Sequence, residues 1–228
     1  MVRADTSESV ATGSAGRTYV SELRQQQAAA TRERVVQAAA ELFAEKGYGG
    51  TTMSAIARRA RVSTETVQNH GPKSQFLRAA IDLVSFAGGR DQPVLETDHG
   101  RRLLAASTPR EAASAAAEVL TAVNRAGHGV WLAFVEAAHH DEGLAAELRE
   151  LVDSIRRQNA LMLGVWRTRG WLRDDVGFDD LVDRAAMLGA VELYDRFVRI
   201  GGGTVERYRE LIAGLLAESV FAAGSPGD

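Results

Sequence analysis

The 228-residue chain contains no cysteine, and this absence removes several classes of protein from consideration. Without thiols there can be no disulfide bond, no thiolate metal site and no cysteine nucleophile. The N-terminus is polar and lacks the apolar segment of a secretory signal. No apolar run approaches the roughly 18 residues that a membrane span needs. We therefore expect a cytoplasmic protein.

The sequence also lacks the motifs of common enzyme classes. It contains neither G-x-S-x-G nor H-E-x-x-H, and no pair of carboxylates stands out from an ordinary acidic surface. The glycines at 201–203 follow an expected helix, so they indicate a chain break and not a phosphate-binding loop. The run HHDE at 139–142 could bind a metal, but a solvated helix terminus is the favoured interpretation. We predict no catalytic residues, no metal site, no cofactor and no enzymatic activity.

Charge is unevenly distributed along the chain, although the net charge is only −3. Residues 1–84 carry 11 Lys and Arg against 8 Asp and Glu, whereas residues 85–228 carry 16 against 22. A mildly basic N-terminal part on an acidic body is typical of a small nucleic-acid-binding head. Many enzymes have halves that differ as much, so this signal needs support from motifs.

No stretch shows the alternation of a β-strand and no internal repeat is visible, so we predict an all-α protein of about nine helices. A composition change near residue 87 separates a small head from a larger body. The predicted parts are a disordered extension at 1–20, a head at 21–87 that the charge asymmetry suggests binds nucleic acid, a body at 88–222, and a disordered tail at 223–228.

Helical spacing and capping signals predict the individual helices. In the head these are residues 21–46 with Gly47 as C-cap, Met53 to Ala60 after Thr52, Thr64 to His70 after Ser63, and 73–87. Residues 87–101 have no period and predict a linker. Thr108-Pro109-Arg110-Glu111 is a capping box with proline at the first helical position, which is a specific helix start. The body helices are expected at 108–124, 128–139, 143–169, 178–199 and 204–222.

The segment TTMSAIARRARVSTETVQNH, residues 51–70, predicts two short helices joined by a tight turn, which is a helix-turn-helix. Burial of Ile56 and Val67 between the helices leaves the polar face of the second helix outward. An α-helix fits the major groove of DNA, where Asn and Gln can bind adenine and Thr can contact a thymine methyl group. The expected DNA contacts are Thr52, Ser63, Thr64, Glu65, Thr66, Gln68, Asn69 and His70. A solvated helical hairpin without function is the alternative.

Residues 31–82, TRERVVQAAAELFAEKGYGGTTMSAIARRARVSTETVQNHGPKSQFLRAAID, resemble the N-terminal domain of the tetracycline-repressor (TetR) family. The resemblance includes AAAELFAEKGY at a helix end and TTMSAIARRARVS across the turn. It implies a homodimer that binds a palindromic double-stranded DNA operator, most often a repressor that an unidentified small-molecule effector releases from DNA.

The chain departs from the family pattern after the second short helix. Gln68 stands where tyrosine is common, and NHGPKS is one residue short. With that gap, Lys73 aligns with the family's phosphate-contacting lysine, whereas an ungapped alignment puts Ser74 there. A small-molecule sensor or carrier whose head no longer binds DNA is therefore the alternative function.

The last two expected helices carry the features of a dimer interface. Small residues would let a partner helix approach closely, and an apolar stripe runs along the final helix. The predicted interface residues are Ala185, Ala186, Gly189, Ala190, Tyr208, Leu211, Ile212 and Leu215. Burial of both stripes inside one subunit is the alternative.

A ligand pocket is expected among aromatic and methionine side chains of the body, although such residues are more often plain core. The candidates are His128, Trp131, Phe134, Glu136, Met162, Trp166, Met187 and Tyr194, with His128, Glu136 and Tyr194 as polar anchors.

Overall fold

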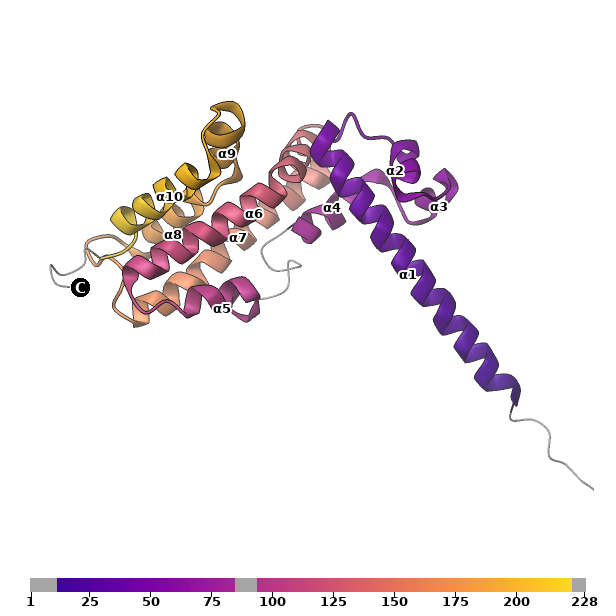
Figure 1. Cartoon of the computed structure of the whole chain (residues 1–228), viewed down its shortest axis with the longest axis horizontal. Coiled ribbons are helices and arrows are strands. Elements are labelled where there is room, and N and C mark those ends of the chain that lie inside the picture. Colours follow the sequence, from indigo (N-terminus) through magenta and orange to yellow (C-terminus); the bar gives the residue numbers. More distant parts are fainter. Residues whose placement is uncertain (1–11, 85–93, 223–228) are drawn as a thin grey trace, which may run out of the picture.

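The computed structural model describes residues 12–84 and 94–222, with side chains from residue 25 onward, and over these ranges it is helical throughout (Figure 1). The β-type pairing in this part of the chain is limited to one isolated bridge between Leu172 and Phe221. None of the described helices is long and apolar enough to cross a membrane. The predicted all-α class is confirmed.

The head consists of four helices: α1 (Thr12–Lys46), α2 (Met53–Ala60), α3 (Thr64–Asn69) and α4 (Lys73–Val84). α1 packs on α2 and α4, and α2 packs on α3. The predicted bounds of α2 are confirmed, and Gly47 after α1 has the positive φ of 71° that suits a glycine C-cap. The first part of α1 projects beyond the head (Figure 1).

The start of α1 was predicted too late. The helix begins at Thr12 and not near Ser21, so residues 12–20 are helical where disorder was expected. No proline interrupts this stretch, and adding residues to an existing helix costs far less than starting a new one. Residues 1–11 and the expected tail at 223–228 lie outside the described residues.

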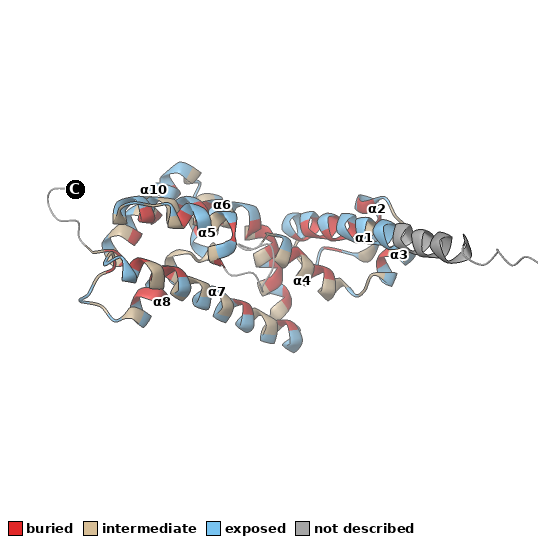
Figure 2. Ribbon diagram, turned by 90° about the horizontal axis from the view of Figure 1, so that it is seen from below, coloured by how far each residue is buried: buried red, intermediate tan, exposed pale blue. Residues whose placement is uncertain are grey.

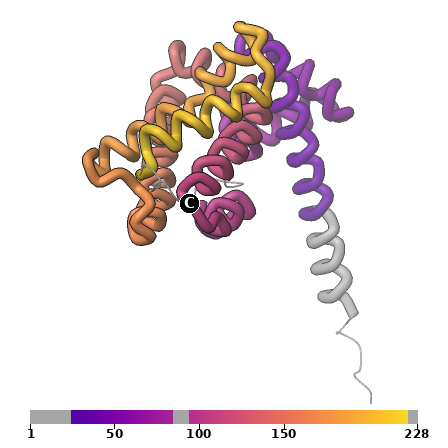
Figure 3. The backbone as a smooth tube through the Cα atoms, turned by 60° about the vertical axis from the view of Figure 1, so that its left-hand side comes forward, coloured from indigo at the N-terminus to yellow at the C-terminus, as the bar shows by residue number. Residues whose placement is uncertain are grey.

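The body contains six α-helices and two short turns of other helical types. They are η1 (Val94–Glu96), α5 (Asp98–Leu104), α6 (Pro109–Ala138), α7 (Glu142–Thr168), α8 (Phe178–Leu188), α9 (Val191–Tyr194), the π-helical turn η2 (Asp195–Ile200) and α10 (Val205–Ser219). α10 lies against α6, which runs through the body (Figure 3). The expected linker at 87–101 is partly wrong, because η1 and the start of α5 lie within it.

Two predicted helices, 108–124 and 128–139, are in fact the single helix α6. Gly127 and Gly129, at and beside the expected gap, are both buried within the helix. A Cβ on Gly129 would lie 2.8 Å from the Cα of Ala44, and one on Gly127 would lie 3.3 Å from the Val84 side chain. The glycines therefore let α1 and α4 approach α6 closely.

The predicted helix 178–199 is interrupted at Gly189 and Ala190. Gly189 ends α8, and α9 begins at Val191. The buried side-chain amide of Asn124 donates to the Gly189 carbonyl oxygen at 3.2 Å, which satisfies an acceptor that the helix end leaves free. A polar group of α6 thus supports the break.

Local capping signals are confirmed in the body. The Thr108 side chain accepts a hydrogen bond from the Glu111 N–H, and the Glu111 carboxylate accepts one from the Ser107 N–H. The HHDE run marks the end of α6 and the start of α7, where the Asp141 side chain accepts from the Leu144 N–H at 3.0 Å. The glycines at 201–203 likewise separate η2 from α10.

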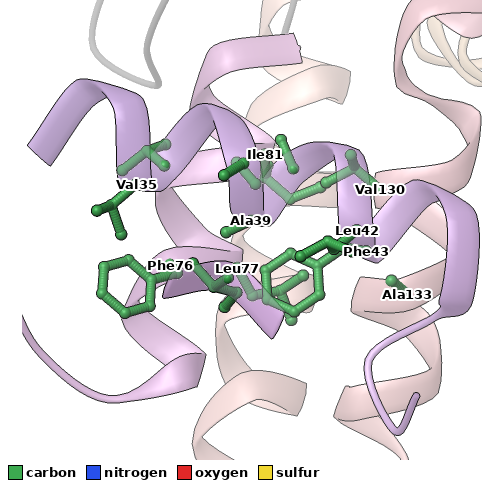
Figure 4. Close-up of a cluster of buried hydrophobic side chains, with 14 of the residues drawn as sticks. Val35, Ala39, Leu42, Phe43, Phe76, Leu77, Ile81, Val130 and Ala133 are labelled. Carbon is green, nitrogen blue, oxygen red and sulfur yellow. The ribbon is translucent and has the colours of Figure 1, made fainter. Parts of the chain in front are cut away.

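Two apolar clusters form the core, and Figure 2 shows buried positions in both the head and the body. The first cluster is shared by the head and the body: Val35, Phe43 and Phe76 pack together with Val130 and Ala133 of α6 (Figure 4). The second lies within the body. Because the head shares its core with α6, a movement of α6 acts directly on the head.

Candidate nucleic-acid interface

Two side-chain caps position the short helices of the head. The hydroxyl of Thr52 accepts from the Ala55 N–H at 3.1 Å, and that of Ser63 accepts from the Thr66 N–H at 3.0 Å. Both caps were predicted from the sequence. Between the helices Arg61 adopts the left-handed conformation, with φ 57° and ψ 47°, which turns the chain from α2 into α3.

The faces of α3 are divided as the sequence predicts. Val67 is fully buried and packs in the same core cluster as Ile56 of α2. The exposed residues are Thr64, Glu65, Gln68 and Asn69, while Thr66 and His70 are half-buried. Thr52 and Ser63 are also exposed, beside the starts of the two helices. α3 therefore presents a continuous polar surface on a fixed apolar base.

The Lys73 ammonium is bound to backbone carbonyl oxygens of the head, so it is less free than an exposed lysine to bind phosphate. Its ammonium donates to the carbonyl oxygens of Tyr48 at 2.9 Å and Thr51 at 3.1 Å, and lies 4.0 Å from the centre of the Tyr48 ring. Burial lowers the pKa of Lys73, while the charge of Glu136 opposes this shift. An ammonium has three N–H donors, so one remains for a phosphate oxygen.

Arginines beside α3 were missed as candidate DNA contacts. Arg58 and Arg61, at the end of α2 and in the turn, are exposed. Arg59 instead pairs with Glu41 at 3.0 Å and Glu45 at 2.8 Å. Hydrogen bonds from Gln37 and from Arg59 lower the pKa of the Glu41 carboxyl. The run RRAR at 58–61 was the available signal, since exposed cations beside a recognition helix suit phosphates.

The body is tied to the head by Glu136 of α6. Its two carboxylate oxygens accept from the N–H groups of Tyr48 at 2.9 Å and Gly49 at 3.1 Å, in the turn between α1 and α2. Lys73 binds the carbonyl oxygens of the same turn. The turn that leads into the helix-turn-helix is therefore held by one residue of the body and one of α4.

The predicted pocket residues are divided between the two apolar clusters, with the His128 and Tyr194 rings in contact at 5.8 Å between centroids. Phe134 and Trp131 belong to the cluster shared with the head, whereas Met162, Trp166 and Tyr194 belong to the body cluster. Met187 is 72% exposed on the outer surface. His128 and Glu136 line one cavity together.

The predicted dimer residues divide into buried and exposed groups. Ala185, Tyr208 and Ile212 lie in the subunit's own core, and the Tyr208 hydroxyl accepts from the buried Asn124 amide at 3.3 Å. Burial raises the pKa of Tyr208. Leu215 is exposed, while the intermediate positions are Ala186, Gly189, Ala190 and Leu211. The alternative of burial within one subunit thus applies to three of the eight.

A helix-turn-helix head on an all-helical body defines a class of DNA-binding regulators. Residues 35–70 match the family model described as "Bacterial regulatory proteins, tetR family". The sequence resemblance to the TetR family is thereby confirmed, and the chain has the fold of a TetR-family transcriptional regulator. Regulators of this family are DNA-binding proteins and not enzymes.

Solved structures with the same fold cover nearly the whole chain. A protein from Saccharomonospora viridis in complex with choline, thought to be a transcriptional regulator, is 19% identical with a TM-score of 0.68, covering 86% of this chain and 100% of its own. A TetR transcriptional regulator from Chloroflexus aurantiacus is 22% identical with a TM-score of 0.65, covering 87% and 100%.

A third similar structure is NalD from Pseudomonas aeruginosa, described as the secondary repressor of the MexAB-OprM multidrug efflux pump. It is 16% identical with a TM-score of 0.64, covering 87% of this chain and 100% of its own. No curated protein matches the sequence. At these identities the structural likeness shows the fold alone.

Proposed function

We propose that the protein is a cytoplasmic, ligand-responsive transcriptional repressor. It binds a palindromic DNA operator as a homodimer and is released by a small molecule. The observation that carries this proposal is the polar outer face of α3, where Gln68 and Asn69 are exposed while Val67 is buried. A short helix with this division suits the major groove, because its polar side chains can reach base edges while its apolar side fixes its position.

The surroundings of α3 suit the DNA backbone. Arg58, Arg61 and the remaining N–H donor of Lys73 can contact phosphates, which sets orientation without sequence preference. Thr52 and Ser63 can contribute through their hydroxyl groups, although both already cap helices. We assign base recognition to the exposed α3 residues and backbone binding to these flanking groups.

Dimerisation is proposed through the outer surface of α8 to α10. Large apolar side chains are exposed there, including Met187 at 72%, Ile200 at 76% and Leu215 at 45%. Exposed apolar surface that gathers on neighbouring elements is typical of an interaction site. A two-fold axis beside these helices would present two heads to two half-sites of a palindrome.

Release from DNA is proposed to follow ligand binding in the body, as the choline complex of the similar S. viridis protein suggests. The similar protein NalD, which is described as a repressor, supports a repressor role in the same way. α6 contacts both α1 and α4, so it can change the spacing of the two heads. Half-sites lie about 34–36 Å apart or a multiple of one turn, and a small shift misaligns both recognition helices.

The test is footprinting of the purified protein on the DNA that flanks its own coding region, together with the salt dependence of binding to random duplex. We expect a protected palindrome and an affinity that falls with salt by a slope of about −0.9 per phosphate contact. Absence of protection and of a salt slope would support the alternative, a sensor or carrier without a DNA-binding head.

A further inference from the structure

A cavity of about 350 Å³ lies where the head meets the body. Its walls come from the end of α1, the middle of α6 and the π-helical turn η2. Its polar lining residues are His128, Glu136, Asp195 and Arg199, and Leu132 and Ala133 give it an apolar wall. A ligand in this cavity would touch the head and the body at once.

Glu136 gives the cavity a direct connection to the helix-turn-helix. The carboxylate that lines the cavity is the one that binds the N–H groups of Tyr48 and Gly49. The Tyr48 ring stacks on Phe43 with centroids 5.8 Å apart, and its carbonyl oxygen accepts from Lys73. A change in what Glu136 binds therefore affects the turn at Tyr48 and Gly49 and, through Lys73, the start of α4.

The charges of the lining favour a cation. Glu136 and Asp195 bring two carboxylates against the single guanidinium of Arg199, His128 adds an imidazole, and the other lining residues are small or apolar. Asp195 and Arg199 both belong to η2, and π-helical turns of this kind occur frequently at functional sites. A ligand with a small apolar part and one positive charge matches this combination, since carboxylates bind ammonium N–H donors strongly.

We propose that this junction cavity binds a small organic ammonium ion, whose charge pairs with Glu136 and Asp195 and whose apolar part lies against Leu132 and Ala133. The ammonium competes with the Tyr48 and Gly49 N–H groups for the Glu136 carboxylate and so loosens the hold of α6 on the head. The regulatory consequence rests on the proposed function; the binding site itself does not. Such a ligand must bind the loosened state more tightly than the DNA-bound state.

The test uses the full chain labelled with ¹⁵N-tyrosine, which contains only four tyrosines. The Tyr48 amide signal is assigned by its disappearance in Tyr48→Phe. Three probes with the same cyclohexyl ring are titrated: cyclohexylammonium, cyclohexanecarboxylate and cyclohexanol. We expect a saturable shift of the Tyr48 signal with the ammonium alone.

Variants separate the site from general effects of charge. Asp195→Asn should weaken cyclohexylammonium binding about tenfold or more, as expected for the loss of a charged hydrogen bond. Glu150→Gln, which removes an exposed carboxylate of α7, should leave it unchanged. Glu136→Gln should shift the Tyr48 signal before any probe is added. If this variant unfolds, Asp195→Asn still tests whether the cavity binds the ammonium.

An unmoved Tyr48 signal, or equal shifts with all three probes, would overturn the proposed site. These outcomes are independent of DNA. A chain that shows the ammonium-specific shift but no affinity for duplex DNA refutes the proposed function and keeps the site. A chain that binds DNA but shows no shift refutes the site and keeps the function.

Discussion

Single residues of the head show strain and charge pairing that stability measurements can detect. Arg61 is the one described residue other than glycine with a positive φ. The left-handed conformation costs an ordinary L-residue about 1–2 kcal/mol, and glycine is the usual residue there. An arginine occupies this position, and its exposed side chain is placed for a second role at the DNA backbone.

We predict that Arg61→Gly raises the free energy of unfolding by about 0.5–1 kcal/mol, because relief of the strain exceeds the added entropy of glycine in the unfolded chain. Urea denaturation of the two proteins measures the difference. Arg58→Gly is the matched control: it places glycine within α2 and should destabilise by about 1 kcal/mol. Equal losses in both variants would contradict the prediction.

The pairing of Arg59 with Glu45 predicts a dependence of stability on pH. The hydrogen bond from Arg59 lowers the pKa of the Glu45 carboxyl. A carboxyl whose pKa is lower in the folded state stabilises the fold above its ordinary pKa of about 4.3, and this contribution is lost as the pH falls through the lowered pKa.

Arg59→Met should therefore be less stable than the unsubstituted chain at pH 7, and the difference should shrink in acid. Thermal denaturation between pH 7 and pH 3 measures it. Arg58→Met, which removes an exposed arginine of the same helix, should show a difference that does not change with pH. A constant difference for Arg59→Met would show that the ion pair does not contribute.

At the scale of elements, the sequence predicts what short-range chemistry decides. The caps at Thr52, Ser63 and Thr108 act within three residues, so the starts of α2, α3 and α6 could be read directly. The roles of Gly129 and Gly189 could not be read from the sequence, because a glycine in a helical pattern is compatible with a break or with close packing. Residues distant in sequence decide between the two outcomes. Gly129 packs closely on Ala44, and the helix break at Gly189 is supported by a hydrogen bond from Asn124.

The same reason explains which parts of the site were missed. Glu136 contacts a turn 87 and 88 residues away, and no local pattern indicates that pairing. The outward face of α3 was predictable because it follows from which of six neighbouring residues are apolar. The inward contacts of Lys73 depend on how the turn at Tyr48 folds back, which spacing alone does not give.

Two helical glycines allow a direct test of the approach between α1 and α6. Gly129→Ala should destabilise the chain by about 1–3 kcal/mol, because the added Cβ meets the backbone of Ala44. Gly164→Ala in α7 should stabilise it by about 0.5–1 kcal/mol, since nothing lies within 4 Å of the new Cβ and alanine is the better helix former. Denaturant unfolding compares the two variants. Stabilisation by both would contradict the close approach.

In the whole molecule, the proposed binding of a palindromic operator requires a dimer that holds two heads. Leu215→Arg places a charge in the proposed interface on α10, and we expect it to weaken dimerisation, so that sedimentation velocity detects the 24.5 kDa monomer. Leu161→Arg on α7, which is exposed to a similar extent, should leave the dimer intact. Dissociation by Leu161→Arg alone would move the interface to α7.

The head and α6 of the body share one apolar core, so their relative positions are coupled. Val35, Phe43 and Phe76 belong to the same apolar cluster as Val130 and Ala133 of α6 (Figure 4). Glu136 adds a polar contact at the adjoining turn. A packed interface of this kind moves between discrete arrangements and does not deform continuously. A ligand that acts on α6 or on Glu136 can therefore reposition α3 without touching it.

Selection of bound sequences from random duplex DNA by the purified protein tests directly whether α3 is the recognition helix of a dimer. We expect enrichment of two inverted half-sites spaced by about 10–10.5 base pairs or a multiple. Gln68→Ala or Asn69→Ala should lose about 1–3 kcal/mol of discrimination at individual bases while keeping the spacing. No enrichment, or an enriched sequence that neither substitution changes, would contradict the assignment of α3 as the recognition helix.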